Sequence, residues 1–139
     1  MSAESINVLI NDSAWAWPQA VREVFSSRAV NLMLVKKADQ ALDVLQHRRI
    51  HTAIVDMESQ MLSGLAVIRM IRPSHPLLPC ILLSNSAEQK LLSEALELDV
   101  FSVINKPVDI EILRSQLNRL FIKRYDSKLF EENNTKKVF

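Results

Sequence analysis

The sequence predicts an α/β fold in which helices cover both faces of a parallel five-stranded sheet. Five short runs are almost entirely apolar, as strands buried on both faces are. Longer segments with the 3.6-residue period of a helix alternate with these runs. The chain has 139 residues, of which 48% are hydrophobic, and this is enough for one domain with one core. We therefore expect a single (βα)5 unit, a doubly wound three-layer sandwich.

The five apolar runs are the expected strands. They cover Ile6 to Ile10, Val30 to Val35, Thr52 to Val55, Cys80 to Leu83 and Val100 to Ile104. Parallel strands are joined by right-handed crossovers. The simplest common arrangement that places helices on both faces of such a sheet has the strand order 2-1-3-4-5.

A segment of helical period follows each run, with apolar residues at spacings near three and four. The predicted helices cover Pro18 to Ser27, Asp39 to Arg48, Ser63 to Arg72, Glu88 to Leu98 and Val108 to Arg124. Proline suits a first helical turn, as at Pro18. Asp39, Ser63 and Ser86 are the expected caps of the helices that follow them.

Composition excludes several classes of protein. The chain carries 17 Lys and Arg against 16 Asp and Glu, so its net charge of +1 gives no overall attraction to nucleic acid or to a membrane surface. The one cysteine, Cys80, cannot form an internal disulfide and is interpreted as a packed core residue. No apolar run reaches the roughly 18 residues of a membrane-spanning helix. We expect a cytoplasmic protein that binds neither nucleic acid nor a membrane directly.

Glycine occurs once, at Gly64, whereas average usage is about 7%. A dinucleotide-binding loop needs three closely spaced glycines and a P-loop needs two, because their backbones approach phosphate closely. Both are excluded. Any phosphate chemistry must therefore use side chains and a metal.

Polar residues follow four predicted strands at their carboxyl ends, where doubly wound sheets bind ligands. The first strand leads into Asn11 and Asp12, the third into Asp56, the fourth into Ser84 and the fifth into Lys106. Two carboxylates that converge in a half-buried crevice repel each other unless a cation lies between them. Mg²⁺ is the candidate, with Asp12 and Asp56 as ligands. Lys106 would add a second positive charge and Ser84 a hydroxyl donor.

These motifs resemble those of the receiver domains of bacterial two-component response regulators, of which the chemotaxis regulator CheY is the single-domain type. The match rests on Asp12, on the segment DMESQMLSG from Asp56 to Gly64, on Ser84 and on Lys106 with the proline after it. It covers about residues 5 to 123. The resemblance implies the CheY-like, flavodoxin-like fold and a cis peptide bond after Lys106.

The resemblance also implies a chemistry. Asp56 would be the nucleophile that takes a phosphoryl group from a phosphohistidine on a sensor histidine kinase or a histidine phosphotransfer protein. Ser84 and Lys106 would hold two phosphoryl oxygens, although Ser84 and the helix cap Ser86 could exchange roles. Such a transfer needs in-line positioning and charge neutralisation rather than a general base. We expect a regulatory domain, which is not an enzyme beyond its own phosphotransfer and dephosphorylation.

The same resemblance assigns the metal ligands. Asp12, Asp56 and the backbone carbonyl of Glu58 would bind Mg²⁺ directly, and Asn11 would contact it through water. Asn11 replaces the acidic residue that is usual in the family, so we expect weaker metal binding. The Glu58 carboxylate could bind metal-bound water or repel the phosphoryl group, and the sequence leaves both open. Asn85, where the family usually has Ala or Gly, could narrow the path to Asp56 and slow transfer or hydrolysis.

The aromatic residue that rotates during signalling in the family is absent from its usual position, three residues before Lys106, which is Val103 here. Phe101 lies two residues away and, by strand alternation, on the same face, which leaves a shifted version of this switch open. Asp99 takes the usual glycine position before the fifth strand, and Gln60 the usual proline position.

Residues 1–124 form the expected receiver domain, and residues 125–139 a C-terminal helical extension or linker. Nothing after Arg124 is long enough for an output domain. The chain is therefore a free-standing receiver that docks on an output partner, or the first part of a regulator with a fused output domain. The fourth helix, fifth strand and fifth helix form the partner surface in most receivers, and a homodimer can also form there. The candidate contacts on this surface are Lys90, Glu94, Glu111 and Arg114.

Two alternatives stay open beside the phosphorylated receiver. The first is an atypical receiver-like interaction module that does not depend on phosphorylation, which the substitutions at Asn11, Asn85 and Val103 favour. The second is a small phosphatase with Asp56 as nucleophile. It is disfavoured because such enzymes look like Asp-x-Asp, whereas Glu58 stands at the second position, and because the chain has no room for a substrate cap.

Overall fold

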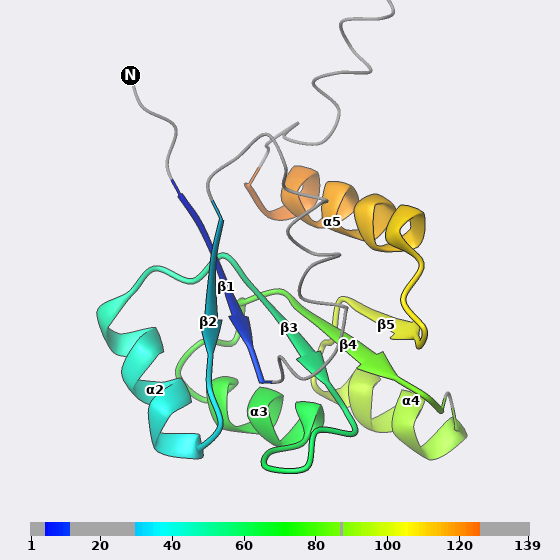
Figure 1. The fold of residues 1–139 in the computed structure, drawn as a ribbon, viewed down its shortest axis with the longest axis horizontal. Coiled ribbons are helices and arrows are strands. Elements are labelled where there is room, and N and C mark those ends of the chain that lie inside the picture. The colour runs from blue at the N-terminus through cyan, green and yellow to red at the C-terminus, as the bar shows by residue number, and fades with distance from the viewer. Residues whose placement is uncertain (1–4, 12–29, 87, 126–139) are drawn as a thin grey trace, which may run out of the picture.

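The apolar runs form five parallel strands in one sheet, in the order β2-β1-β3-β4-β5 (Figure 1). The computed structural model describes residues 5–11, 30–86 and 88–125. The predicted fold class and strand order are confirmed. The strands are β1 (Ile6–Ile10), β2 (Val30–Leu34), β3 (Thr52–Asp56), β4 (Cys80–Ser84) and β5 (Ser102–Asn105).

The helices within the described ranges lie close to their predicted positions. They are α2 (Ala38–His47), α3 (Gly64–Ile71), α4 (Gln89–Glu97) and α5 (Ile110–Tyr125). The helix predicted over Pro18 to Ser27 lies outside the described residues. No helix in the described part of the chain combines the length and the apolar character needed to cross a membrane.

Of the predicted helix caps, Ser63 is confirmed and two are wrong. The Ser63 hydroxyl accepts a hydrogen bond from the N–H of Ala66 at 3.3 Å, which satisfies a free donor of the first turn of α3. Asp39 lies inside the first turn of α2, after the cap position at Lys37. Helix α4 begins after Glu88, and Ser86 is instead hydrogen-bonded to Ser84. The Ser86 backbone therefore forms hydrogen bonds with the end of β4, and Ser86 does not cap α4.

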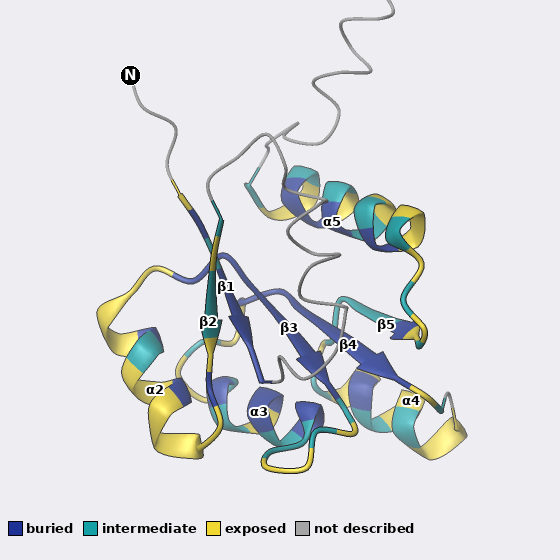
Figure 2. Cartoon of the chain, viewed as in Figure 1, coloured by how far each residue is buried: buried dark blue, intermediate teal, exposed yellow. Residues whose placement is uncertain are grey.

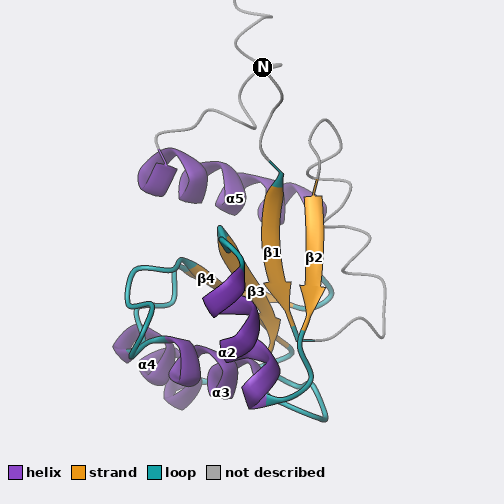
Figure 3. Ribbon diagram, turned by 90° about the vertical axis from the view of Figure 1, so that its left-hand side faces the viewer, coloured by secondary structure: helices purple, strands orange, loops and turns teal. Residues whose placement is uncertain are grey.

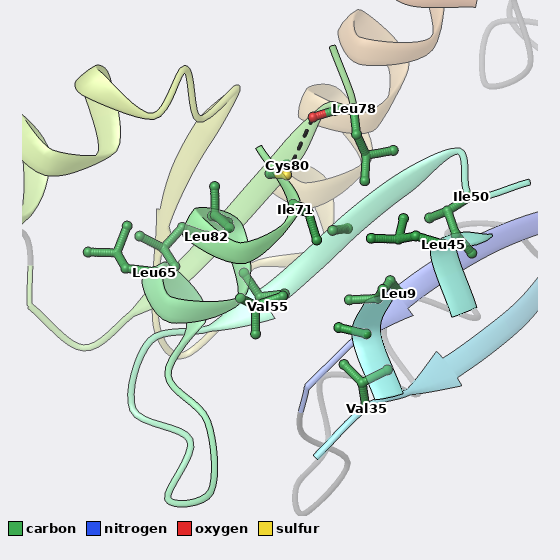
Figure 4. Close-up of a cluster of buried hydrophobic side chains, with 14 of the residues drawn as sticks. Leu9, Val35, Leu45, Ile50, Val55, Leu65, Ile71, Leu78, Cys80 and Leu82 are labelled. Carbon is green, nitrogen blue, oxygen red and sulfur yellow. Dashed lines mark hydrogen bonds between the residues drawn. The ribbon is translucent and has the colours of Figure 1, made fainter. Parts of the chain in front are cut away.

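Among the described residues, one helix lies on one face of the sheet and three lie on the other (Figures 1 and 3). Helix α5 packs on one face, where its leucines meet Val8, Ile54 and Leu83. Helices α2, α3 and α4 pack on the other, against Leu9 and Leu82 among others (Figure 4). Successive strand residues point to opposite faces, so each inner strand contributes to both cores. Burying each such side chain stabilises the fold by about 1.5 to 3 kcal/mol.

Burial is deepest in β3 and β4, where every residue is buried, and shallowest in the edge strand β2 (Figure 2). Cys80, at the start of β4, has no exposed surface and donates its S–H to the carbonyl of Leu78 at 3.4 Å. Burial raises the pKa of its thiol to about 11, against a smaller opposing effect of Arg72. This agrees with the interpretation of Cys80 as a core residue.

The turn between α4 and β5 replaces the family's glycine with Asp99, which has φ 54°. This is the left-handed region, which aspartate tolerates better than most residues with a Cβ. The Arg72 guanidinium supports the turn by donating to the carbonyls of Leu98 at 2.7 Å and Asp99 at 3.2 Å.

The expectation that Phe101 shares a strand face with Val103 is wrong. Phe101 packs against the core beneath α5, and the Arg119 guanidinium lies 5.8 Å from the centre of its ring. Val103 packs against the core beneath α4. Strand β5 begins at Ser102, so the two-residue alternation does not extend back to Phe101. Phe101 is therefore not a displaced copy of the family's aromatic switch in this structure.

Candidate functional site

The carboxyl ends of four strands bring together the polar residues that the sequence singled out. Asn11 follows β1, Asp56 ends β3, Ser84 ends β4 and Lys106 follows β5. Asn11, Asp56 and Ser84 are each at most 2% exposed. Asp12 lies outside the described residues, so its place at the site stays a prediction.

The Asp56 carboxylate accepts hydrogen bonds from the Lys106 ammonium and from a backbone amide. Lys106 Nζ donates to Asp56 Oδ1 at 2.8 Å and to Oδ2 at 2.9 Å. The backbone N–H of Glu58 donates to Oδ1 at 2.8 Å. Lys106 is itself fixed by its own N–H, which donates to the carbonyl of Ser84 at 2.9 Å, and a cis peptide bond joins it to Pro107. A buried carboxylate therefore has the charge partner that its burial requires.

A second carboxylate, that of Glu58, joins the same network. Its Oε1 lies 2.8 Å from Lys106 Nζ and accepts the N–H of Asn85 at 2.9 Å. Its Oε2 lies 2.8 Å from Ser84 Oγ. The single Ser84 proton has two acceptors at this distance, Glu58 Oε2 and the carbonyl of Ser86. The sequence suggested a metal-bound water or repulsion for Glu58, but it did not reveal these three contacts.

The two carboxylates share one ammonium, and this sharing shifts the pKa values of Glu58 and Lys106. Burial acts to raise the pKa of the Glu58 carboxyl, but hydrogen bonds from Lys106, Asn85 and Ser84 and the charge of Lys106 together lower it. Burial likewise acts to lower the pKa of Lys106, and the contacts with Asp56 and Glu58 outweigh this and raise it. Lys106 is therefore cationic, and Glu58 anionic, at neutral pH.

Asn11 binds the main chain on the other side of Asp56. Its Oδ1 accepts the N–H of Asp56 at 2.7 Å, and its Nδ2 donates to the carbonyls of Asp56 at 2.9 Å and Leu62 at 2.6 Å. A carboxylate at this position could accept the first bond but could not donate the other two. The amide of Asn11 thus links β1 to the end of β3 and to the loop before α3. The contact of Asn11 with a metal through water stays a prediction.

Gly64 completes this side of the site. A Cβ at Gly64 would lie 2.5 Å from Leu82 Cδ1 and 3.1 Å from the carbonyl carbon and oxygen of Asp56. The only glycine of the sequence therefore lets α3 begin directly against the end of β3. A hollow of about 310 Å³ opens beside Glu58 and Ser84, lined also by Leu91 at α4.

The oxygen donors present are suitable for a magnesium ion. Mg²⁺ binds to one or two carboxylates and completes its shell with carbonyls, waters and phosphate oxygens. The Asp56 carboxylate and the Glu58 backbone carbonyl are donors of this kind. Among the described residues, no group of three or more His, Cys, Asp or Glu side chains could hold a metal ion.

A family model decides the classification of this chain. The model of the response regulator receiver domain matches residues 8–118. The chain belongs to the family of response regulator receiver domains. The family implied by the sequence motifs is thus confirmed, and with it the two-component signalling system in which such regulatory domains function.

Relatives of this receiver domain are distant. It is 22% identical over 120 residues to the response regulator RR06 of Streptococcus pneumoniae, covering 86% of this chain and 54% of that protein. It is 23% identical over 116 residues to a putative NtrX-like response regulator of Rickettsia bellii, covering 82% and 24%. It is 20% identical over 119 residues to the transcriptional regulatory protein ZraR of Escherichia coli O157:H7, covering 86% and 27%. The chain thus spans about a quarter of the last two relatives and about half of the first.

Solved receiver structures share the fold. The signal receiver domain of an HD domain-containing protein from Pseudomonas fluorescens superimposes with a TM-score of 0.74 at 22% identity, covering 89% of this chain and 100% of that one. A response regulator receiver protein from Pseudomonas putida has a TM-score of 0.70 at 26% identity, covering 86% and 99%.

Proposed function

We propose that this receiver domain is phosphorylated on Asp56 and signals through the resulting change at the carboxyl end of its sheet. The observation that carries the proposal is the double hydrogen bond from Lys106 Nζ to both Asp56 oxygens, with Ser84 at the end of the neighbouring strand. A nucleophilic carboxylate, a cation and a hydroxyl donor are the groups that phosphoryl transfer to a side chain requires.

In the transfer, one Asp56 oxygen attacks the phosphorus of a phosphohistidine. The O–P bond forms as the P–N bond breaks, and the leaving nitrogen keeps the bonding electron pair. Lys106 neutralises charge on the phosphoryl oxygens, and the Ser84 hydroxyl donates to one of them. Mg²⁺ would be held by Asp12, Asp56 and the Glu58 carbonyl, and it would supply further positive charge. The product is an acyl phosphate on Asp56.

The test is to incubate the protein with Mg²⁺ and phosphoramidate and to measure its intact mass. The expected result is the gain of one phosphoryl group, which is lost in Asp56→Asn and abolished by EDTA. The Asn side chain keeps the shape of the site but is a poor nucleophile. An adduct that persists in Asp56→Asn would place the modification elsewhere and contradict the assignment.

The partners follow from the family and belong to the same proposal. A cytoplasmic sensor histidine kinase or a histidine phosphotransfer protein would supply the phosphoryl group. An output partner, a fused output domain or a second copy of the chain would respond to it. The surface of α4, β5 and α5 is the candidate contact face, with Lys90, Glu94, Glu111 and Arg114. On this face Glu94 pairs with Arg69, and Glu111 Oε1 lies 3.4 Å from Arg114 Nε.

A second candidate is an interaction module that does not depend on phosphorylation. The contacts of the Glu58 carboxylate favour it, because they use Ser84 and Lys106 without any phosphoryl group. If no donor phosphorylates Asp56, and Asp56→Asn binds the partner as well as the natural chain does, this candidate is the better account.

A further inference from the structure

The Glu58 carboxylate collects hydrogen-bond donors from two different strand ends. Ser84 ends β4 and Asn85 comes directly after it, and Lys106 follows β5. All three present their donors to the two oxygens of one carboxylate at 2.8 to 2.9 Å. A carboxylate with three donors at these distances forms a complete anion site that the chain fills with its own side chain.

The same donors are needed by a phosphoryl group on Asp56. The proposed function assigns two phosphoryl oxygens to Ser84 and Lys106, and the Asn85 N–H is the next donor along the chain. We propose that the Glu58 carboxylate occupies the position of the phosphoryl oxygens and must leave it before Asp56 can be phosphorylated. This inference rests on the proposed function and adds a residue that sets the rate of the reaction.

The backbone keeps Glu58 beside the nucleophile. Its N–H donates to Asp56 Oδ1 at 2.8 Å, so the side chain begins within one hydrogen bond of the reacting oxygen. Both carboxylates contact the same Lys106 ammonium at 2.8 Å. Among the described side chains, an incoming phosphoryl group would therefore meet the negative charges of Asp56 and Glu58 beside the one positive charge of Lys106 while Glu58 stays in place.

Glu58 is able to leave this position. Its side chain is 36% exposed, whereas that of Asp56 is 1% exposed, so its movement uncovers no core. The hollow of about 310 Å³ is lined by Glu58 itself, by Lys90 and by the carboxylates of Glu88 and Glu94, and it gives the Glu58 carboxylate space outside the donors. Glu58 therefore slows phosphorylation and does not prevent it.

The test compares Glu58→Ala with Glu88→Ala. Both changes remove one negative charge, and both residues line the same hollow, but the Glu88 side chain makes no cap hydrogen bond at the start of α4. The rate of phosphorylation by phosphoramidate in Mg²⁺ is measured by intact mass. We expect about a tenfold increase in Glu58→Ala, since losing the competition of a charged hydrogen bond changes a barrier by about one factor of ten. Glu88→Ala should stay within about twofold of the natural chain.

The outcomes separate this inference from the proposed function. If the natural chain is phosphorylated on Asp56 and Glu58→Ala reacts no faster, the inference is overturned and the proposed function stands. If neither chain is phosphorylated while both stay folded by circular dichroism, the proposed function fails and the inference fails with it. A natural chain that reacts slowly beside a rapid Glu58→Ala supports both.

A second measurement reports the position of Glu58 without any phosphorylation. Hydrogen exchange of the Asn85 amide is followed by NMR in the natural chain and in both variants. The Asn85 N–H should exchange at least about tenfold faster in Glu58→Ala, because its acceptor is gone, and at an unchanged rate in Glu88→Ala. Equal exchange in all three chains would show that Glu58 does not hold this donor, and it would overturn the inference.

Discussion

Asp56 is held by different kinds of contact on its two sides. Toward β1 and α3, Asn11 makes three hydrogen bonds to main-chain atoms and is 2% exposed. Toward β4 and β5, Lys106 and Glu58 make ionic contacts between side chains, and Glu58 is 36% exposed. Among the described residues, the Asn11 side contributes no charge, and it fixes where the Asp56 backbone lies. The charged side sets its electrostatic environment and can exchange partners while the backbone stays in place.

The largest effect is expected from Asn11→Asp, which restores the residue type usual in the family. The new carboxylate cannot donate to the carbonyls of Asp56 and Leu62, and it adds buried negative charge beside Asp56. We expect the free energy of unfolding in EDTA to fall by about 2 to 4 kcal/mol. Urea denaturation measures this, and Asn85→Asp, the same change at an exposed residue, is the control. Equal stability of the two variants would mean that the main-chain bonds of Asn11 contribute little.

Gly64→Ala is expected to destabilise the fold on the same side of Asp56, toward β1 and α3, because the added Cβ clashes with its neighbours. The added Cβ would press on Leu82 and on the carbonyl of Asp56, while alanine recovers up to about 1 kcal/mol of helix propensity. Overpacking costs about 1 to 3 kcal/mol, so we expect a net loss of about 1 to 2 kcal/mol in urea denaturation. Adding Leu82→Val removes the clash with Leu82 Cδ1 but leaves the clash with Asp56. A double variant that regains the natural stability would show that the Asp56 contact is harmless.

The charged side is expected to contribute little to stability and to do so only when Glu58 is ionised. Its folded pKa is below its unfolded pKa, so its contribution is present above about pH 4.5 and is lost as the pH falls through the folded value. The pair is partly exposed, so we expect less than about 1 kcal/mol. The stability of the natural chain is compared with that of Glu58→Gln from pH 7 to pH 3. The difference should shrink as the pH falls, and a constant difference would contradict this origin.

The smallest effect is expected from Asn85→Ala. Asn85 contributes its backbone N–H to the network, and the residue is exposed. The free energy of unfolding should change by less than about 0.5 kcal/mol. If the side chain narrows the path to Asp56, as its size in the sequence suggests, phosphorylation will accelerate in Asn85→Ala. We expect Glu58→Ala to accelerate phosphorylation far more than Asn85→Ala does. If Asn85→Ala reacts faster than Glu58→Ala, the Asn85 side chain limits the rate of phosphorylation more than Glu58 does.

Local patterns were sufficient to predict the sheet and the helices that lie within the described residues. The strand order follows from buried parallel strands and right-handed crossovers, and the site follows because parallel strands end at one edge. Strand ends were less certain. Phe101 was misplaced because β5 begins at Ser102, two residues after the predicted start at Val100, and Ser86 because its backbone bonds to Ser84.

The contacts around Asp56 could not be predicted because they join residues far apart in sequence. Nothing in the segment around Asn11 indicates that the Leu62 carbonyl will lie within reach of its amide. The acidic Glu58 two residues after Asp56 was a visible signal, but the donors that its carboxylate accepts come from two other strand ends. Which of several polar neighbours a side chain contacts depends on the geometry of the folded chain.

Cys80 gives this domain an internal chemical reporter. It is the only thiol of the sequence and lies fully buried at the start of β4. With a pKa of about 11, it is also protonated at neutral pH and thus unreactive as a nucleophile. An alkylating reagent can reach it only after the centre of the sheet has opened. The rate at which Cys80 is alkylated therefore reports how fast β4 separates from the neighbouring strands. This can be measured in every variant described above without an engineered probe.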